Sequence, residues 1–150
     1  MADLTIEELQ QIFPDATVET WHRHPNGGGW VQNTASVSNT AHVRGNACVS
    51  GNACVSGDAR VYGNAQVFGD AQVSGDTRVC GDAHVYGNAR VCGDAQVSGY
   101  TQVSGYAQVS GNARVSSDAR VYGNARVCGD AQVFGDAQVS GDAWVSGNAQ

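Results

Sequence analysis

The chain has 150 residues, only 7% of them aromatic, and it carries 14 acidic residues against 8 basic ones. The formal net charge of −6 argues against a general affinity for nucleic acids or acidic membranes, because both require clustered basic charge. No apolar run is long enough to cross a membrane, and the acidic start is unlike a signal peptide. We therefore expect a cytoplasmic protein with neither a nucleic-acid nor a membrane partner.

Residues 1–30 are expected to form an N-terminal cap. Thr5 and Glu8 stand at the spacing of a capping box, and the apolar residues after them recur at helical spacing, which predicts a helix over residues 5–13. Pro14 then ends this helix. Because the end of a stacked array exposes unpaired strand edges and an open core, we expect the helix to cover that end.

The rest of the cap is predicted to be a degenerate entry coil followed by a Gly-rich loop. Residues 14–18 repeat the later phrase with Pro in place of Gly, one position out of phase with the array. His22 and His24 precede Gly27-Gly28-Gly29, but no third ligand converges on the two histidines, so we interpret the segment as an ordinary polar loop. The glycines lack a Lys and a following helix, which excludes a phosphate-binding loop.

Residues 31–150 are one six-residue phrase, Val-x-Gly-(Asn/Asp)-Ala-x, repeated without insertion or deletion. Ala and Val two positions apart lie on one face of an extended segment, so they are expected to fill a narrow interior. Gly followed by Asn or Asp is typical of turns. Each copy is therefore predicted to be a short strand and a corner, stable only when stacked on its neighbours.

The array resembles the hexapeptide-repeat proteins, whose consensus places an aliphatic residue every six positions and a small residue two before it, as in Ala89-Arg90-Val91. This resemblance implies an all-β fold, a triangular left-handed parallel β-helix with three copies in each coil. The handedness rests on the resemblance alone, because the usual crossover rule favours right-handed connections. The array would then form about 6.7 coils.

All five cysteines occupy positions predicted to point outward. Cys92 and Cys128 share a column in an eighteen-residue coil, but they are two coils apart, roughly 9.6 Å at the usual strand spacing. That separation is too long for a disulfide, and the other pairs lie in different columns. We expect free thiols, which favour a reducing compartment.

Aromatic residues gather in one outward column and form the predicted binding surface. Phe68, Tyr86 and Tyr122 share this column, and Tyr106 lies beside the gap in it. Aromatic side chains supply a large contact area at low entropic cost, which favours an interface. The alternative is that these rings only stack across coils and stabilise the sheet.

A second face carries arginines next to a corner column of aspartates, Asp58, Asp76, Asp94 and Asp130. Carboxylate oxygens are ligands for hard cations, so this column is a candidate divalent-cation ladder. The alternative is a solvated face on which arginine offsets the repulsion between stacked carboxylates.

The resemblance also implies an enzymatic alternative. Many hexapeptide-repeat proteins are acyltransferases that bind an acyl-CoA, such as acetyl-CoA, between neighbouring solenoids and use a histidine as base, often beside a loop that interrupts the array. His84 is the candidate base here, but the array has no interruption, and neither His42 nor His84 has a carboxylate partner that the sequence can place. Other members are zinc-dependent carbonic anhydrases with three convergent histidines, which this sequence does not supply.

We therefore predict a non-enzymatic structural scaffold or protein-interaction module that needs no cofactor or metal. Its expected partner is itself, as a lateral or end-to-end homo-oligomer, or an unidentified protein. The array runs to Gln150 without a closing helix, from which we expect either that the sequence is a fragment or that the open end docks on another molecule. An acidic decoy for a nucleic-acid-binding protein is a third class, supported only by charge.

Overall fold

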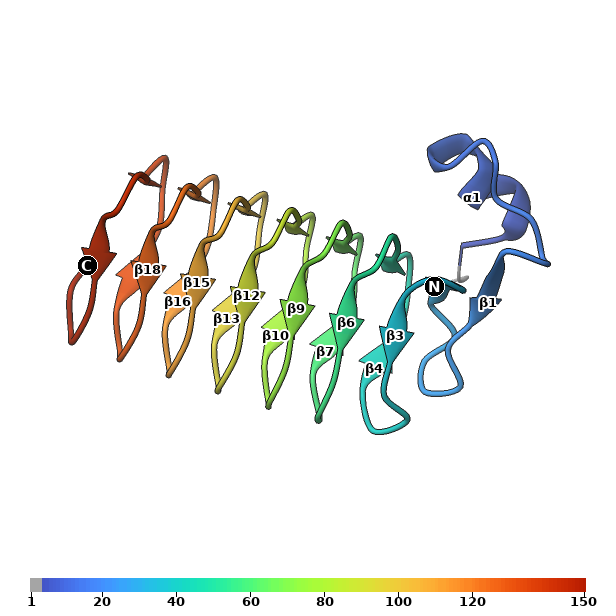
Figure 1. Ribbon diagram of the computed structural model, residues 1–150, viewed down its shortest axis with the longest axis horizontal. Coiled ribbons are helices and arrows are strands. Elements are labelled where there is room, and N and C mark those ends of the chain that lie inside the picture. The colour runs from blue at the N-terminus through green and yellow to red at the C-terminus, as the bar shows by residue number, and fades with distance from the viewer. Residues whose placement is uncertain (1–3) are drawn as a thin grey trace.

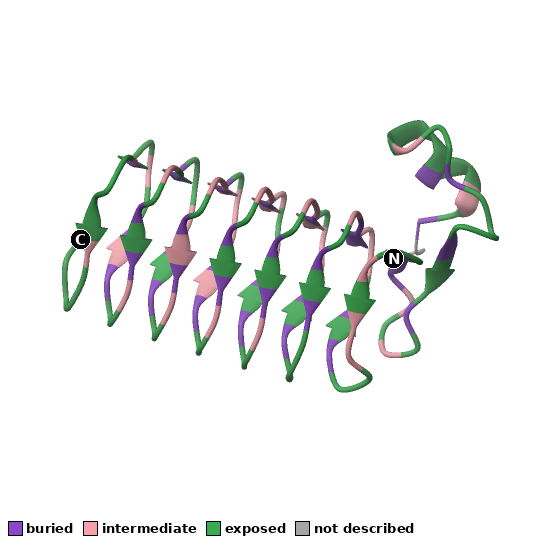
Figure 2. Ribbon diagram, in the orientation of Figure 1, coloured by how far each residue is buried: buried purple, intermediate pink, exposed green. Residues whose placement is uncertain are grey.

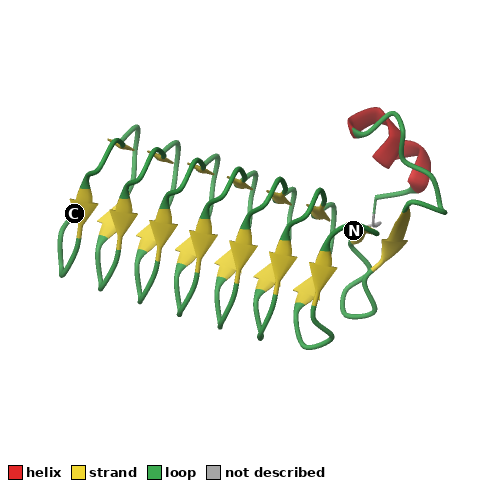
Figure 3. Cartoon of the chain, in the orientation of Figure 1, coloured by secondary structure: helices red, strands yellow, loops and turns green. Residues whose placement is uncertain are grey.

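The computed structural model describes residues 4–150 as a solenoid of stacked parallel coils, of about six turns, with a short helix at its N-terminal end (Figure 1). The strands form three sheets, and loops join successive strands of each coil (Figure 3). The prediction of an all-β parallel solenoid with one N-terminal helix is confirmed. Within the described residues, no helix has the length and apolar character needed to cross a membrane.

In the described part of the chain, residues 4–150, 21 strands form three sheets, and helix α1 spans Ile6–Ile12. The eight-stranded sheet contains β1 (Trp21–Arg23), β2 (Trp30–Gln32), β5 (Cys48–Val49), β8 (Gln66–Val67), β11 (His84–Val85), β14 (Gln102–Val103), β17 (Arg120–Val121) and β20 (Gln138–Val139). The seven-stranded sheet contains β3 (Ser36–Val37), β6 (Cys54–Val55), β9 (Gln72–Val73), β12 (Arg90–Val91), β15 (Gln108–Val109), β18 (Arg126–Val127) and β21 (Trp144–Val145). The six-stranded sheet contains β4 (His42–Val43), β7 (Arg60–Val61), β10 (Arg78–Val79), β13 (Gln96–Val97), β16 (Arg114–Val115) and β19 (Gln132–Val133).

The strand register confirms that three copies make one coil. Val79 pairs in parallel with Val61 on one side and Val97 on the other, so each residue meets its equivalent eighteen positions away. The main chain of each coil donates to the next one, as when Arg60 N donates to Thr77 O at 2.9 Å. Residues eighteen positions apart therefore form straight columns along the solenoid.

The interior consists of the repeated Val and Ala side chains, as predicted. These residues form one continuous cluster, and most of them are fully buried from Ala41 to Ala131 (Figure 2). Two copies carry Thr in place of Ala, at Thr77 and Thr101, and both are fully buried. The hydroxyl groups of these two threonines have no hydrogen-bond partner, so each costs free energy that Ala would not.

The corners depend on glycine for two reasons. Gly93 has a φ of 74°, in the left-handed region that side chains rarely adopt. A Cβ built on Gly93 would also lie 3.0 Å from the backbone nitrogen of Gly111 in the next coil. Coils therefore stack with glycine over glycine at close range. At Gly45 the φ is similar, 68°, but the nearest backbone atom would lie 3.4 Å from an added Cβ.

The predicted N-terminal helix is confirmed, but not its expected position over the open end of the array. Thr5 is the N-cap of α1 and accepts a hydrogen bond from Glu8 N, while the Glu8 side chain accepts one from Thr5 N, which is the reciprocal pattern of a capping box. The helix buries Leu9 against Trp21, Trp30 and Cys48. It thus packs on the outward face of the eight-stranded sheet and not across the open interior.

The predicted entry coil at residues 14–18 is wrong. Val18, which would point inward in a coil, is 73% exposed, and Thr17 and Thr20 close a turn in which Trp21 N donates to Thr17 O at 2.9 Å. The chain then forms β1, which pairs antiparallel with β2. The out-of-phase position of the segment is the physical reason, because a parallel coil requires its inward residues to match the register of the array.

Replacement of Thr77 by Val is expected to stabilise the protein by about 1 kcal/mol, because it substitutes a methyl group of similar size for an unpaired buried hydroxyl. Urea unfolding followed by circular dichroism measures the effect. Thr77→Ser is the matched control: it keeps the hydroxyl, removes the methyl group and should destabilise by about 1 kcal/mol. Equal midpoints for the two variants would contradict the assignment.

Replacement of Gly93 by Ala is expected to cost about 1–3 kcal/mol more than the same change at Gly45. Both variants strain a backbone of positive φ, but only the Cβ at position 93 would press on the next coil. The difference between their urea midpoints therefore isolates the coil-to-coil contact. If the two variants lost the same stability, the close approach of the next coil would not be the reason for glycine at position 93.

Candidate functional site

The outward face of the eight-stranded sheet carries the aromatic column predicted from the sequence. Tyr86 N donates to Val103 O and Tyr122 N to Val139 O, each at 2.9 Å, which places both tyrosines directly after strands of this sheet. The Phe68 and Tyr86 rings are parallel within 2°, with centroids 5.0 Å apart. The expected stacking across coils therefore occurs at this pair. Tyr122 lies two coils beyond Tyr86, because Ser104 occupies the position between them.

Two corner tyrosines flank the gap at Ser104. Tyr106 follows β14 and Tyr100 precedes it, so they lie at opposite borders of the eight-stranded sheet on the same coil. Both occupy the position that carries Asn or Asp in most copies, and they are 65% and 67% exposed. We define Phe68, Tyr86, Tyr100, Tyr106 and Tyr122 as the aromatic face. The column positions of Tyr86 and Tyr122 lie about 9.6 Å apart, or two strand spacings, and Tyr86 Oη donates to Gln102 Oε1 of the coil between them at 3.5 Å.

The structure places His84 beside this face. The His84 ring meets the Phe68 ring edge-on, with centroids 6.3 Å apart. Its outward position in β11 puts it between Gln66 and Gln102 of the neighbouring coils. These neighbours are an aromatic ring and two amides, and none of them is a carboxylate that would pair with the imidazole. This environment favours a packing role.

The predicted aspartate column occupies the corner before the six-stranded sheet. Asp58, Asp76 and Asp94 follow one another from coil to coil, and Asp130 accepts a hydrogen bond from Asn112 Nδ2 at 3.0 Å. Among residues 4–150, no group of three or more His, Cys, Asp or Glu side chains has the geometry of a metal site. The cation ladder stays a prediction, and the side-chain hydrogen bond found in this column joins Asn112 to Asp130.

The six-stranded sheet has a smaller outward cluster of Arg44, Tyr62 and Cys80. The Arg44 guanidinium lies 5.0 Å from the centre of the Tyr62 ring, within cation–π range. A hydrogen bond with the Cys80 side chain, together with burial, raises the pKa of Tyr62. The phenol, which is neutral at pH 7 even with its ordinary pKa, therefore keeps its proton to a higher pH.

A family model, the YdcK beta solenoid repeat, matches the array in overlapping segments. The matched residues are 54–69, 59–75, 83–99, 107–118, 119–135, 131–147 and 137–150, which together cover more than half of the chain. The chain belongs to the YdcK beta-solenoid repeat family. The prediction of a β-solenoid repeat protein is thereby confirmed, whereas membership of the hexapeptide transferases stays a prediction.

Searches of curated proteins and of solved structures returned no match to this YdcK-type solenoid. All seven matched segments lie within the array, and none includes residues 1–53. The family match therefore bears on the repeated coils. The N-terminal segment must be interpreted from its own contacts.

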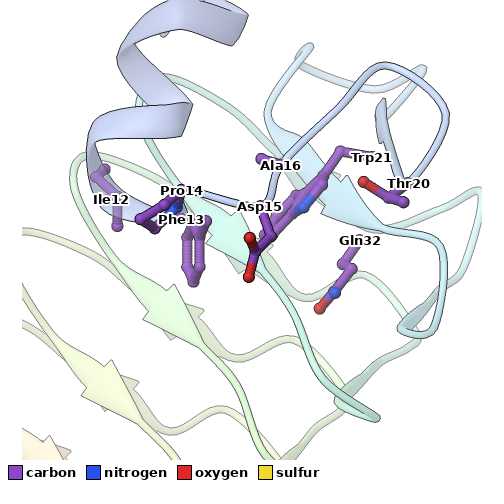
Figure 4. Close-up of a pocket in the computed structure, with 8 residues that line it drawn as sticks. All are labelled: Ile12, Phe13, Pro14, Asp15, Ala16, Thr20, Trp21 and Gln32. Atoms are coloured by element: carbon purple, nitrogen blue, oxygen red, sulfur yellow. The ribbon is translucent and has the colours of Figure 1, made fainter.

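One hollow of this YdcK-type solenoid lies between the end of α1 and β1, where the sequence predicted no site (Figure 4). It has a volume of about 360 Å³, and the Phe13 and Trp21 rings at its wall have centroids 4.8 Å apart. Asp15, Thr20 and Gln32 supply its polar side chains. This hollow suits a small apolar group, but Trp21 and Phe13 belong to the cluster that holds the cap in place.

Cys48 is a free thiol at an outward position, as predicted for all five cysteines, but it is buried. Its side chain points out of the solenoid, but α1 and Trp30 cover it, and it is 1% exposed. Burial raises the pKa of the Cys48 thiol to about 12. Trp30 stands eighteen positions before Cys48, so two apolar residues in one outward column were the sequence signal that this part of the surface is covered.

Replacement of Leu9 by Ala is expected to raise the alkylation rate of Cys48 by iodoacetamide at least about tenfold. Leu9 is fully buried in the cap cluster, and its truncation weakens docking by about 2–5 kcal/mol. Mass spectrometry of each cysteine measures the rate, with exposed Cys54 as internal reference. Ile12→Ala, at an exposed position of the same helix, should leave the rate unchanged.

The raised pKa also predicts how cap docking depends on pH. The thiol is more acidic when the cap is released than when it is docked, with a pKa near 9 against about 12. The stabilisation from burying the neutral thiol is complete below about pH 9 and is lost as the pH rises towards 12. In the variant Cys48→Ala this alkaline weakening of the cap, followed by Trp30 fluorescence, should be reduced.

Proposed function

We propose that this YdcK-type solenoid is a non-enzymatic scaffold that binds another protein molecule, first of all a second copy of itself, through the aromatic face. The observation that carries the proposal is the clustering of five aromatic residues on one border-to-border stretch of one sheet, two of them at corners where the other copies carry mainly Asn or Asp. Tyr100, Tyr106 and Tyr122 are exposed, and Phe68 and Tyr86 are half-buried. Aromatic side chains that gather in one accessible patch are typical of the centre of protein interfaces.

The gap at Ser104 supports a specific mode of contact. Phe68 and Tyr86 stack 5.0 Å apart, close to the usual spacing of neighbouring strands. A ring from the partner inserted between Tyr86 and Tyr122 would continue this stack where the chain itself leaves a vacancy. The exposed rings of Tyr100 and Tyr106 would enclose it from the two corners.

Several finer features belong to the same proposal. The resemblance to hexapeptide-repeat proteins implies a left-handed coil, and the three sheets support a triangular cross-section. The five free thiols support a reducing compartment such as the cytoplasm. The acyltransferase alternative would need an acyl-CoA groove at His84, and none of the hollows at the cap, at β3 or at the C-terminal coil has His84 in its lining.

The double variant Tyr86→Ser with Tyr122→Ser is expected to weaken self-association at least about tenfold, because loss of central aromatic anchors costs more than about 1.4 kcal/mol. Sedimentation velocity over a concentration series measures the change. Phe134→Ser is the matched control, since Phe134 occupies the same repeat position on the six-stranded sheet and is also exposed.

Two outcomes would contradict the proposal. A wild-type protein that stays monomeric throughout the micromolar range would remove self-association, and equal association of the double variant and the wild type would remove the aromatic face. Saturable micromolar binding of acetyl-CoA, measured by calorimetry, would favour the acyltransferase alternative.

A further inference from the structure

The first coil presents three strand edges towards the N-terminal side of the solenoid, and two of them are covered by other parts of the chain. On the eight-stranded sheet, β1 pairs antiparallel with β2. On the six-stranded sheet, residues 26–29 take the place of a preceding coil: Val43 N donates to Asn26 O at 3.0 Å, and Val43 O accepts from Gly29 N at 2.8 Å. Both covers are main-chain covers.

Glycine is what allows the second cover to approach so closely. A Cβ on Gly29 would lie 2.6 Å from the Val43 side chain, and one on Gly27 would lie 2.5 Å from Val43 O. The Gly-rich loop is therefore an edge-covering segment. The side chains of His24 and Asn26 anchor it, since each bonds to a main-chain oxygen of residues 38–39.

The third edge, that of β3, has no such cover. Ser36 N and Ser38 N both donate towards β6, to Ala53 O and Val55 O at 2.9 Å. Main-chain groups alternate in direction along a strand, so the N–H and C=O of Val37, between these two serines, point away from β6. Within residues 4–150, β3 is the last strand of its sheet, and no hydrogen bond joins these two groups to another residue.

The inward valine of the third edge is also less buried than the inward valines of the two covered edges. The equivalent inward valines Val31 and Val43 are 1% and 0% exposed, whereas Val37 is only partly buried, as is Ala35 next to it. A hollow of about 530 Å³ lies along this edge and includes His22, Val37 and Cys54 in its lining. The remaining lining residues are Ala, Ser and Val, so the hollow presents no carboxylate, ammonium or guanidinium group.

We propose that the β3 edge binds an extended, uncharged peptide segment of a partner protein, which adds to the seven-stranded sheet as its next strand. The two covered edges indicate the occupant, because each is closed by main chain that pairs with the inward-facing residue of the edge strand. The N–H and C=O of Val37 form a donor and an acceptor that the main chain of an extended peptide can satisfy together. A small apolar side chain of the peptide would cover Val37 and Ala35. This inference does not depend on the aromatic face.

Amide hydrogen exchange at Val37, measured by NMR on the full chain, tests the proposal. The probe is a capped peptide with the sequence of residues 102–110, which is uncharged and contains the Ala-x-Val unit that fills the interior of the array. In the free protein, Val37 is expected to exchange at least about tenfold faster than Val43, its bonded counterpart in the same coil. Saturating peptide should slow exchange at Val37 at least about tenfold and leave Val43 unchanged.

A control peptide with Pro in place of both Gln108 and Val109 lacks a main-chain donor towards β3 in either strand direction and should protect Val37 much less. Exchange at Val37 as slow as at Val43 in the free protein would overturn the proposal, and so would a Val37 rate that saturating peptide leaves unchanged. Protection that rises with protein concentration in the absence of peptide would replace the partner peptide with a second copy of the chain.

Discussion

The short distance between the main chains of successive coils determines where every side chain of this molecule lies. Every coil donates main-chain hydrogen bonds to the next, and at the corners the backbones approach until an added Cβ on Gly93 would lie 3.0 Å from the nitrogen of Gly111. Main chains held at this separation force all side chains eighteen positions apart into columns. The stacked rings of Phe68 and Tyr86, 5.0 Å apart, reproduce the same spacing on the surface. Surface geometry is thus set by the backbone and not by the side chains themselves.

Stability and recognition occupy different positions of the repeat as a result. Val, Ala and Gly build the interior and the corners, and they repeat almost without exception. The residues on either side of each Val point outward and vary. A change such as Ser to Tyr at an outward position leaves the ladder intact, whereas Thr77 shows that even a small polar group at an inward position leaves a hydroxyl unpaired. The aromatic face could therefore change without altering the fold.

Most of the array was predictable from the sequence, and most of the cap was not. Because the same six-residue pattern recurs throughout the array, it predicts an equivalent position for each equivalent residue. The pattern therefore predicted the strand positions, the inward Val and Ala, the columns and the clustering of Phe68 with Tyr86. The capping box of α1 was predictable for the same reason, because it involves residues three positions apart. The antiparallel pairing of β1 with β2 occurs once and joins unlike sequences, so no repetition revealed it. The burial of Cys48 depends on that same unique packing.

The eighteen-residue column has a consequence for how such a protein changes over generations. Near-identical six-residue repeats favour unequal recombination of the coding sequence, which removes or adds whole repeats. Loss of eighteen residues shortens the rod and returns each later side chain to its own sheet. Loss of six residues preserves the interior equally well but turns the remainder by one side, so that Tyr122 would leave the column of Tyr86. A change of three copies therefore preserves both the fold and the surface columns. A change of one copy preserves the fold but not the columns.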